Sequence, residues 1–298
     1  MTRAMHRYPG GMRKTLVAVH AHPDDESSKG AGTVAHYAEL GVRSVLVTAT
    51  GGEAGDILNP AVDPSVKERL ADVRRTELME AARIIGFDEV ILLGYRDSGM
   101  PESPDNAHPD ALVNADCDEV LGRLVSIVRR ERPAVLLGYD EHEFYPHPDH
   151  LCVNQLMKDA FEAAADPARF PEAGPPWAVT HLYAPSFTAR RIVTLHEAML
   201  ARSMASPFGR WLEFVDPDND ARKRLVSVDI SDHLETARAA LRAHRTQVDP
   251  EGFWFQVPLD LVREIYPYED FELLATRSDP DLSSGDLFSN VVEPDEQG

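Results

Sequence analysis

The chain has 298 residues, of which 43% are hydrophobic and 27% charged; this composition predicts a folded protein with a sizeable core and excludes wholesale disorder. Its 50 acidic and 30 basic residues give a formal net charge of −20, which argues against duplex DNA or an anionic membrane as a partner. Two cysteines, no apolar run of the ~18–20 residues that span a membrane and no apolar leader predict a cytoplasmic protein without disulfides.

Short apolar runs alternate with helical patterns through the first 165 residues. The predicted order is strand 15–21, helix 27–40, strand 44–49, helix 64–85, strand 89–93, helix 116–130, strand 134–138 and a helix ending near residue 165. This alternation is typical of an α/β fold, in which a mostly parallel sheet has helices on both faces. Functional sites in such folds form beyond the carboxyl ends of the strands.

The pattern changes after Asp166, where four prolines fall between residues 167 and 176. Short strands are predicted at 181–184, 226–230 and 271–274, and helices at 194–204 and 231–245. We expect an extension over 1–13, one domain over 14–278 and, within it, an α+β elaboration over 165–278 that caps the active site. Residues 279–298 hold six acidic residues and no basic one, which predicts a mobile tail.

Two short motifs combine histidine and aspartate directly after predicted strands. His22-Pro23-Asp24-Asp25 follows strand 15–21, and His147-Pro148-Asp149-His150 lies in the loop after strand 134–138. Parallel strands can bring two such loops together, so that His22, Asp25 and His150 converge. Two imidazoles and one carboxylate leave coordination positions open, as in a catalytic zinc site. Fe(II) could occupy the same ligands in a reducing cell.

Three further residues of these motifs could take part in hydrolysis. Asp24 could accept a proton from water, His147 could donate to or stabilise an oxyanion, and Asp149 could orient His147. Either motif alone could simply cap a helix. Two motifs, each at the end of a strand, favour a metal-dependent hydrolase over an Fe(II) oxygenase, which usually carries His-x-Asp on a barrel strand. A non-catalytic sugar- or nucleotide-binding module is disfavoured because no Gly-x-Gly-x-x-Gly follows the first strand.

The sequence also resembles a known family. The runs that carry the resemblance are AVHAHPDDESSKGAGT, TGGEAGDILNP, RRTEL, RDSGMP, YPHPDH and HRTQVDP. They are similar to the zinc-dependent LmbE-like/PIG-L N-deacetylase superfamily, from about Lys14 to Leu274. The resemblance implies a Rossmann-like fold, bound zinc and hydrolysis of an amide on a glucosaminyl-inositol.

Within the superfamily, the likeness is greatest to an actinobacterial branch that acts in detoxification. The implied partner is a small-molecule substrate, a mycothiol S-conjugate, which is cut into an N-acetylcysteine conjugate and glucosaminyl-inositol. Two alternatives stay open. One is deacetylation of N-acetylglucosaminyl-inositol in mycothiol biosynthesis, and the other is processing of one mycothiol adduct in secondary-metabolite biosynthesis. The sequence also leaves open whether the chain forms a homo-oligomer.

Carried over to this sequence, the resemblance implies a role for each matching residue. His22, Asp25 and His150 would bind zinc, Asp24 would be the general base, and His147 would be the electrostatic or acid group, supported by Asp149. Tyr145 would help to polarise the amide carbonyl. The implied substrate-binding residues are Lys29, Glu53, Arg74, Asp97, His244 and Gln247. Lys29 belongs to the run SSKG, typical of the conjugate-cleaving branch, and a cation there could recognise the thiol arm.

Each of these substrate-binding residues also has a plainer interpretation. Arg74 could pair with Glu77 or Glu80 on its own helix, and Asp97 could cap the turn before Gly99. Lys29 and Glu53 could be solvated, and His244 and Gln247 could simply end a helix. Tyr145, the residue implied to polarise the carbonyl, could be a packed aromatic side chain of its loop. One departure from the family is clear, since Glu143-Phe144 stands where the conjugate-cleaving branch has two glycines. This pair adds bulk beside the metal loop and removes backbone freedom. His142, beside this pair, could be an extra metal ligand or simply solvated.

Overall fold

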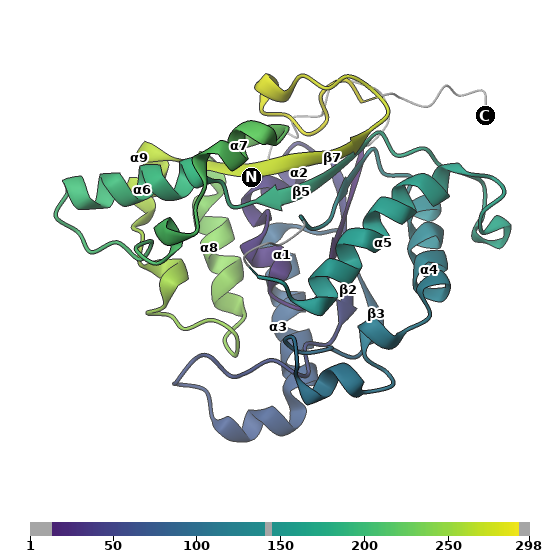
Figure 1. Cartoon of the computed structure of the whole chain (residues 1–298), viewed down its shortest axis with the longest axis horizontal. Helices are drawn as coiled ribbons and strands as arrows, with labels where there is room; N and C mark the ends of the chain where they lie inside the picture. Colours follow the sequence, from purple (N-terminus) through teal and green to yellow (C-terminus); the bar gives the residue numbers. More distant parts are fainter. Residues whose placement is uncertain (1–13, 141–144, 292–298) are drawn as a thin grey trace, which may run out of the picture.

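Apolar, β-branched runs form the centre of one mixed β-sheet in the computed structural model, which describes residues 14–140 and 145–291. Within this part of the chain the strand order is β3-β2-β1-β4-β5-β7-β6 (Figure 1). The strands are β1 (Thr15–His20), β2 (Arg43–Thr50), β3 (Glu89–Tyr95), β4 (Val135–Leu137), β5 (His181–Ser186), β6 (Leu225–Asp229) and β7 (Tyr268–Thr276). Every residue of β1 is buried, as expected of a central parallel strand covered on both faces.

The first five strands of the chain, β1 to β5, all run parallel to one another. β7 runs antiparallel to both β5 and β6. The second half of the chain therefore extends the same sheet beyond β4. The predicted α/β fold, with a mostly parallel, Rossmann-like sheet and a C-terminal α+β elaboration, is confirmed.

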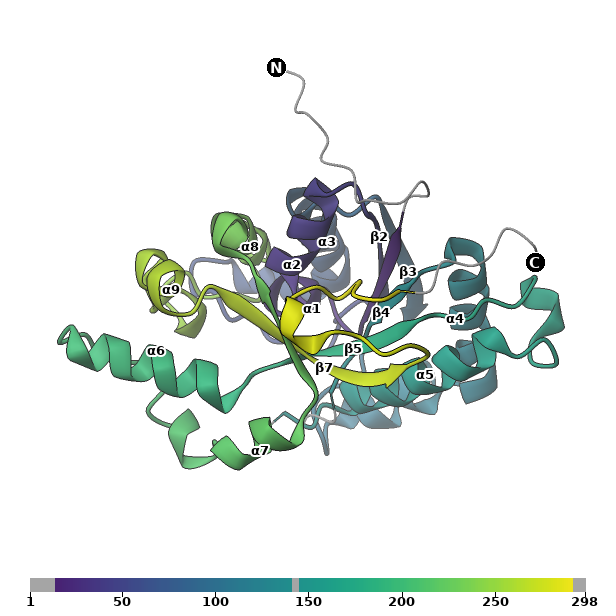
Figure 2. The ribbon, with the colours of Figure 1, turned by 90° about the horizontal axis from the view of Figure 1, so that it is seen from above.

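Helices cover both faces of this sheet. They are α1 (Asp25–Ser28), α2 (Ala31–Glu39), α3 (Leu70–Ile85), α4 (Cys117–Glu131), α5 (Pro148–Ala165), α6 (Ala189–Ala201), α7 (Pro217–Arg222), α8 (Leu234–Ala243) and α9 (Leu259–Ile265). α2, α3 and α8 pack together on one face, and α4 and α5 pack together on the other (Figure 1). α6, α7 and α9 gather at one end of the molecule, away from α4 (Figure 2).

Two predicted helices differ from those observed. The helix expected over 27–40 is split into α1 and α2, because Gly30 between them has a φ of 101°, a conformation that glycine adopts without strain. The helix expected over 64–85 begins with a 3₁₀ turn, η1 (Pro64–Arg69), before α3. It ends as predicted at Gly86, whose φ is also 101°.

The prediction of a mobile tail from residue 279 is wrong as far as residue 291. Leu287 and Phe288 are buried in the core on the side of α2. The Tyr37 hydroxyl donates to Asp286 and accepts from the backbone N–H of Leu287. Acidic composition alone did not reveal the two apolar residues that anchor this segment. In the part of the chain that the structure describes, no helix combines the length and apolar character needed to cross a bilayer.

Candidate metal centre

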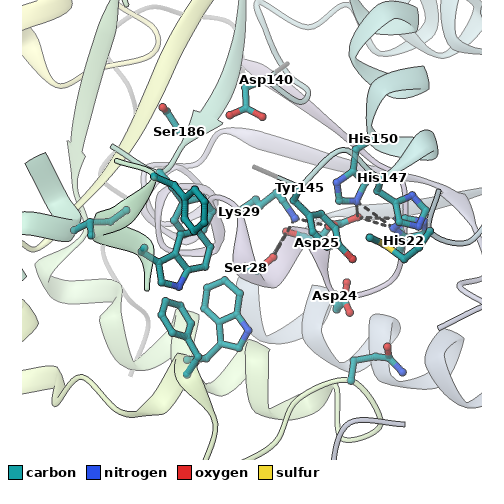
Figure 3. A pocket seen from close by; sticks show the side chains of 18 of the residues that line it. His22, Asp24, Asp25, Ser28, Lys29, Asp140, Tyr145, His147, His150 and Ser186 are labelled. Atoms are coloured by element: carbon teal, nitrogen blue, oxygen red, sulfur yellow. Dashed lines mark hydrogen bonds and ion pairs between the residues drawn. The ribbon is translucent and has the colours of Figure 1, made fainter. Parts of the chain in front are cut away.

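The two histidine–aspartate motifs meet because β1 and β4 are neighbours in the sheet. His22 and Asp25 lie just beyond the carboxyl end of β1, and His150 lies in the first turn of α5, which follows β4. His147 is the residue that caps the N-terminus of α5, where its Nδ1 accepts the backbone N–H of Asp149 at 3.2 Å. The side chains of His22, Asp25, His147 and His150 point toward one another (Figure 3).

Three side-chain atoms form a nearly equilateral triangle. Nδ1 of His22 lies 3.4 Å from Oδ2 of Asp25 and 3.2 Å from Nε2 of His150. The third side, from His150 Nε2 to Asp25 Oδ2, is also 3.4 Å. A tetrahedral zinc ion with bonds of about 2.0–2.1 Å separates its ligand atoms by about 3.3–3.4 Å. The three buried residues could therefore hold one divalent metal ion and leave its fourth position to a water molecule or substrate.

His22 also belongs to a second group of potential ligands, together with Asp97, His147 and Asp149. Here its Nε2 lies 3.1 Å from Oδ2 of Asp149. That oxygen also accepts the backbone N–H of Ser98 at 2.9 Å, and the Ser98 hydroxyl donates to Oδ1. We interpret this second group as a hydrogen-bonding network, because a carboxylate behind a metal-bound histidine fixes its tautomer and orientation.

The role predicted for Asp149 therefore needs correction. Its carboxylate contacts His22 on the side away from the triangle, whereas sequence reasoning had it orient His147. The hydrogen bond between Asp149 and His147 is donated by the backbone N–H of Asp149. The reason is that Asp149 is in the first turn of α5 with its side chain buried beneath His22 and Ser98. Ser98 was missed in the sequence, because no chemistry of its own marks it and its position depends on the loop after β3.

Asp25 is held in its charged form by its neighbours. Burial alone would raise its pKa, but Lys29 and His150 hold the pKa of the Asp25 carboxyl well below its usual range. Nζ of Lys29 lies 2.5 Å from Oδ1 of Asp25, so each oxygen of this carboxylate has its own partners. The Tyr139 hydroxyl, which sequence reasoning missed, donates to Oδ2 of Asp25 and accepts the backbone N–H of Ala21. Lys29 thus pairs with a metal-ligand candidate while it also lines the cavity.

The histidines of the site differ in their electrostatics. Burial lowers the pKa of His150 to about 3, which leaves a neutral imidazole that can act as a ligand. Burial and the neighbouring His22 lower the pKa of His147 to about 4. Because Nδ1 of neutral His147 accepts a hydrogen bond, its proton is assigned to Nε2, which lies 3.7 Å from Oδ1 of Asp97. Although burial acts in the opposite direction, hydrogen bonds that His22 donates to Asp149 and Asp25 raise the pKa of its imidazole, evidence of a strongly negative site.

Asp24 adopts a backbone conformation that non-glycine residues rarely adopt, with a φ of 118°. Such strain costs about 1–3 kcal/mol and is typical of functional sites. Asp24 lines the cavity beside the triangle (Figure 3). Burial raises the pKa of its carboxyl, and the opposing effect of Arg74 is smaller. A carboxylate with a raised pKa in this position is suited to accept a proton.

Arg74 joins the loops that follow β1 and β2. Its guanidinium donates to Oδ2 of Asp24 at 3.2 Å, to the carbonyl of Pro23 at 2.5 Å and to the carbonyl of Gly52 at 2.9 Å. A Cβ on Gly52 would lie 2.4 Å from this guanidinium, so the loop requires glycine for the close approach. The predicted alternative, a pair with Glu77, is not observed, since Glu77 accepts hydrogen bonds from Thr246 instead.

A buried ion pair lies behind Asp24. Glu26 accepts the backbone N–H of Asp24 at 2.9 Å, and its other carboxylate oxygen lies 2.6 Å from Nε2 of His244. Both side chains are buried, and His244 is not among the residues that line the cavity. Its predicted contact with substrate is therefore replaced by a contact with Glu26. Sequence reasoning missed Glu26 because its partner is 218 residues away along the chain.

The remaining predicted substrate residues lie around the same cavity or support it. Asp97 and Gln247 line the cavity. Oδ1 of Asp97 accepts the backbone N–H of Gly99, as a turn cap would, and also lies 3.5 Å from Nε2 of His22. Glu53 does not line the cavity and accepts the backbone N–H of Asp97, so it positions that loop. Nε2 of Gln247 donates to the carbonyl of Asp56, which joins two further segments of the wall.

Tyr145 lies at the mouth of the site, and 49% of its surface is exposed. Its ring centroid is 5.5 Å from that of His150 and 6.1 Å from that of His147. The ring therefore borders the space in which a substrate carbonyl would lie. The departure at Glu143-Phe144 and the extra ligand considered at His142 lie outside the described residues.

The cavity that contains the triangle has a volume of about 1280 Å³. Near the metal ligands it is lined by polar groups, among them Asp24, Asp97, Arg74 and Gln247. Farther away, beyond Lys29 and Ser28, aromatic side chains gather on the opposite side (Figure 3). These come from segments after β5, so the C-terminal elaboration closes one side of the site.

Comparisons with known proteins agree with this geometry. The family model described as "PIG-L: GlcNAc-PI de-N-acetylase" matches residues 17–161, which include all three residues of the triangle. A mycothiol S-conjugate amidase of Streptomyces coelicolor is 41% identical over 93% of this chain and 97% of that protein. A 1D-myo-inositol 2-acetamido-2-deoxy-alpha-D-glucopyranoside deacetylase of Streptomyces avermitilis is 36% identical over 94% of this chain and 98% of that protein.

Solved structures share the fold at lower sequence identity. N,N'-diacetylchitobiose deacetylase from Pyrococcus horikoshii superimposes with a TM-score of 0.59 at 21% identity, covering 88% of this chain and 84% of that one. The 4-carboxy-2-hydroxymuconate hydratase GalB from Pseudomonas putida has a TM-score of 0.61 at 20% identity, covering 91% and 100%. A hydratase and a deacetylase on one fold show that the reaction must be argued from the site.

Proposed function

Because the chain belongs to the PIG-L family of GlcNAc-PI de-N-acetylases, we propose that this metal-dependent amidohydrolase uses zinc to cleave the amide bond of mycothiol S-conjugates. The products would be an N-acetylcysteine S-conjugate and glucosaminyl-inositol. The observation that carries the proposal is the triangle of His22, Asp25 and His150, with sides that match a tetrahedral metal ion and with Asp24 beside it.

A divalent metal ion bound to the triangle would lower the pKa of a water molecule and polarise the carbonyl of the amide. Zinc suits the two imidazoles and one carboxylate, and Fe(II) is the other ion that these ligands could take. The carboxylates of Asp25, Asp97 and Asp149 around His22 supply the negative potential that favours a cation. Asp149 keeps the His22 ring oriented through its contact with Nε2.

Asp24 and His147 would carry out the proton transfers. Asp24 accepts one proton as water adds to the carbonyl carbon, and the same proton passes to the nitrogen of the leaving amine as the C–N bond breaks. His147, with its proton on Nε2, donates a hydrogen bond to the carbonyl oxygen as that oxygen gains negative charge. Tyr145 borders the same space and can donate its hydroxyl proton to that oxygen as well.

The size of the cavity supports a large acyl group. At about 1280 Å³ it exceeds the roughly 300–1,000 Å³ that is usual for small-molecule sites. Several relatives, however, are named for deacetylation of an acetamido-sugar inositol. Lys29, which the sequence linked to the thiol arm, pairs with Asp25 while it lines the cavity. Deacetylation of N-acetylglucosaminyl-inositol is therefore the second candidate.

One experiment separates the two candidates. The kcat/KM of the purified protein is measured for a mycothiol S-conjugate and for N-acetylglucosaminyl-inositol, with metal content determined on the same sample. A higher kcat/KM for the conjugate supports the proposal, and preference for the acetylated sugar makes deacetylation the function. A metal-replete sample that hydrolyses neither compound would overturn both and point to one dedicated adduct.

A further inference from the structure

One side of the cavity is a wall of aromatic rings, formed by Phe187, Trp211, Phe214, Phe253 and Trp254. Four of these rings, all except Phe214, form a chain of contacts. The Phe187 and Trp254 centroids are 6.1 Å apart, Phe253 lies edge-on to Trp254 at 5.5 Å, and Trp211 stacks on Phe253 at 5.5 Å. The five residues come from three segments, namely the turn before α6, the stretch between α6 and α7, and the stretch before α9.

The aromatic wall is more exposed than a structural role requires. Phe187 and Trp211 each have 38% of their surface exposed, and Phe214 has 64%. Core residues of this size normally lose nearly all contact with water, and a continuous exposed aromatic surface inside a concave site usually binds something. Arg191 lies over the Phe187 ring at 6.0 Å, whereas Arg222 pairs with Asp216 and Lys223 pairs with Glu272.

The chemistry of the cavity divides at the metal ligands. On one side are groups that hydrogen-bond, namely Asp97, Asp56, Gln247 and Arg74. These suit the many hydroxyl groups of a glucosaminyl-inositol. On the other side, beyond Lys29 and Ser28, lies the aromatic wall, which offers flat apolar faces (Figure 3). A hydrolase that places its scissile bond at the metal ligands presents the amine part to one side and the acyl part to the other.

We propose that the aromatic wall is a subsite for a flat apolar group carried on the acyl side of the substrate. The inference rests on the proposed function, and it names the class of conjugate, which is a thioether with an aryl or arylalkyl substituent. An acetyl group is too small to cover the wall, so the acyl part of a simple deacetylase substrate would leave it exposed. The rival occupant is the sugar ring itself, since aromatic faces also contact the C–H faces of sugars.

Binding can be measured without turnover. The chain has three tryptophans, of which Trp211 and Trp254 are in the wall. Trp177 is remote, because its indole N–H donates to the carbonyl of Pro133 at the amino end of β4. In a Trp177→Phe variant, all tryptophan fluorescence then comes from the wall. We expect S-benzyl-N-acetylcysteine to quench this fluorescence saturably, while N-acetylcysteine at equal concentration does not. Equal quenching by both compounds, or by neither, would overturn the inference.

Kinetics identify the part of the substrate that contacts the wall. For a Trp211→Ala variant we expect kcat/KM to fall about tenfold or more with an S-benzyl conjugate, because an aromatic contact and its buried area are lost. The value should change little with an S-methyl conjugate or with N-acetylglucosaminyl-inositol. Trp211→Phe should retain most of the kcat/KM for the S-benzyl conjugate. If Trp211→Ala does not fold, Trp254→Ala removes a different ring of the wall and serves as the second test. Trp177→Phe is the control.

The two proposals fail in different ways. If all substrates lose kcat/KM equally in the variant, the wall holds the sugar, and the subsite assignment is overturned while the hydrolase stands. If the unmodified, metal-replete protein cleaves no substrate but S-benzyl-N-acetylcysteine still quenches the wall selectively, the proposed function fails and the aromatic subsite stands.

Discussion

At the scale of single residues, the site depends on a distinction between two adjacent aspartates. The carboxylate of Asp25 keeps its charge because Lys29 pairs with Oδ1 and two imidazoles lie 3.4 Å from Oδ2. Asp24 sits in a strained conformation with φ 118°, lines the cavity, and has its pKa raised by burial. The strain is what turns one carboxylate away from the other, so that neighbouring residues can serve as ligand and base.

Replacement of the base should separate metal binding from chemistry. We expect Asp24→Asn to keep its metal and to lose turnover by about 10²–10⁴-fold, because an amide of the same shape cannot accept the proton. The measurements are kcat and metal content on one preparation. Asp118→Asn, at an exposed position of α4 that does not line the cavity, is the control and should retain its kcat. Near-normal kcat for Asp24→Asn would mean that another group is the base.

Two histidines of one helix turn should respond differently. His150→Ala removes one corner of the triangle and should lose the metal, whereas His147→Ala should keep the metal and lose turnover by about 10²-fold, since a donor to the oxyanion is lost. Elemental analysis after dialysis and kcat with added zinc distinguish the two. Full metal occupancy in His150→Ala would show that the metal uses the other group of ligands around His22.

At the scale of elements, the site depends on helices that are distant along the chain. α1 carries Glu26, α8 ends just before His244, and their buried ion pair fixes the backbone N–H of Asp24. α3 contributes Arg74, which joins the loops after β1 and β2. These contacts hold Asp24 in position. His244 takes part although it does not line the cavity. A helix that packs on the sheet thereby also sets the geometry of a catalytic loop.

Loss of this ion pair should be costly. His244→Ala leaves the Glu26 carboxylate buried without its partner, and we expect the free energy of unfolding to fall by about 3–5 kcal/mol. The control is His233→Ala, at the other end of α8, where the histidine faces a more exposed Glu39; there the fall should be about 1 kcal/mol or less. Chemical denaturation of both variants tests this. Equal, small losses would show that Glu26 finds another partner.

A comparison of prediction and structure shows where sequence patterns suffice. The strand at 15–21 and the motif after it were predictable because apolar runs and local spacing are properties of adjacent residues. Gly30 was not recognised as a break, because apolar periodicity continues through it into α2. The contacts of Glu26 with His244, and of Asp149 with Ser98, join residues 218 and 51 positions apart, and no local pattern encodes them. The triangle was predictable, but what surrounds it was not.

At the scale of the whole molecule, the C-terminal segment closes the core beside α2. Leu287 and Phe288 are buried there, and Tyr37 binds the backbone around them. This contact connects the end of the described chain to α2, on one face of the sheet that carries the metal centre. The core therefore includes residues that composition had assigned to a tail.

Shortening a buried side chain in this segment should destabilise the protein without a direct effect on the metal centre. Leu287→Ala creates a cavity at a fully buried position, and we expect a loss of about 2–5 kcal/mol in the free energy of unfolding. Leu200→Ala, at a position on α6 that is 54% exposed, is the matched control and should cost about 0.5 kcal/mol or less. Thermal melting and metal content are measured together. A Leu287→Ala protein as stable as the control would contradict the packing of this segment.

The aromatic wall and the residues of the metal centre lie in different halves of the sequence. The family model ends at residue 161, after the triangle, and every ring of the wall lies between residues 187 and 254. Mutations at the rings of the wall could therefore alter which acyl groups fit while the metal ligands, Asp24 and His147 stay unchanged. Such a division would let selection or protein engineers change the range of acyl groups that the site accepts, without any change in the loops that carry the metal ligands.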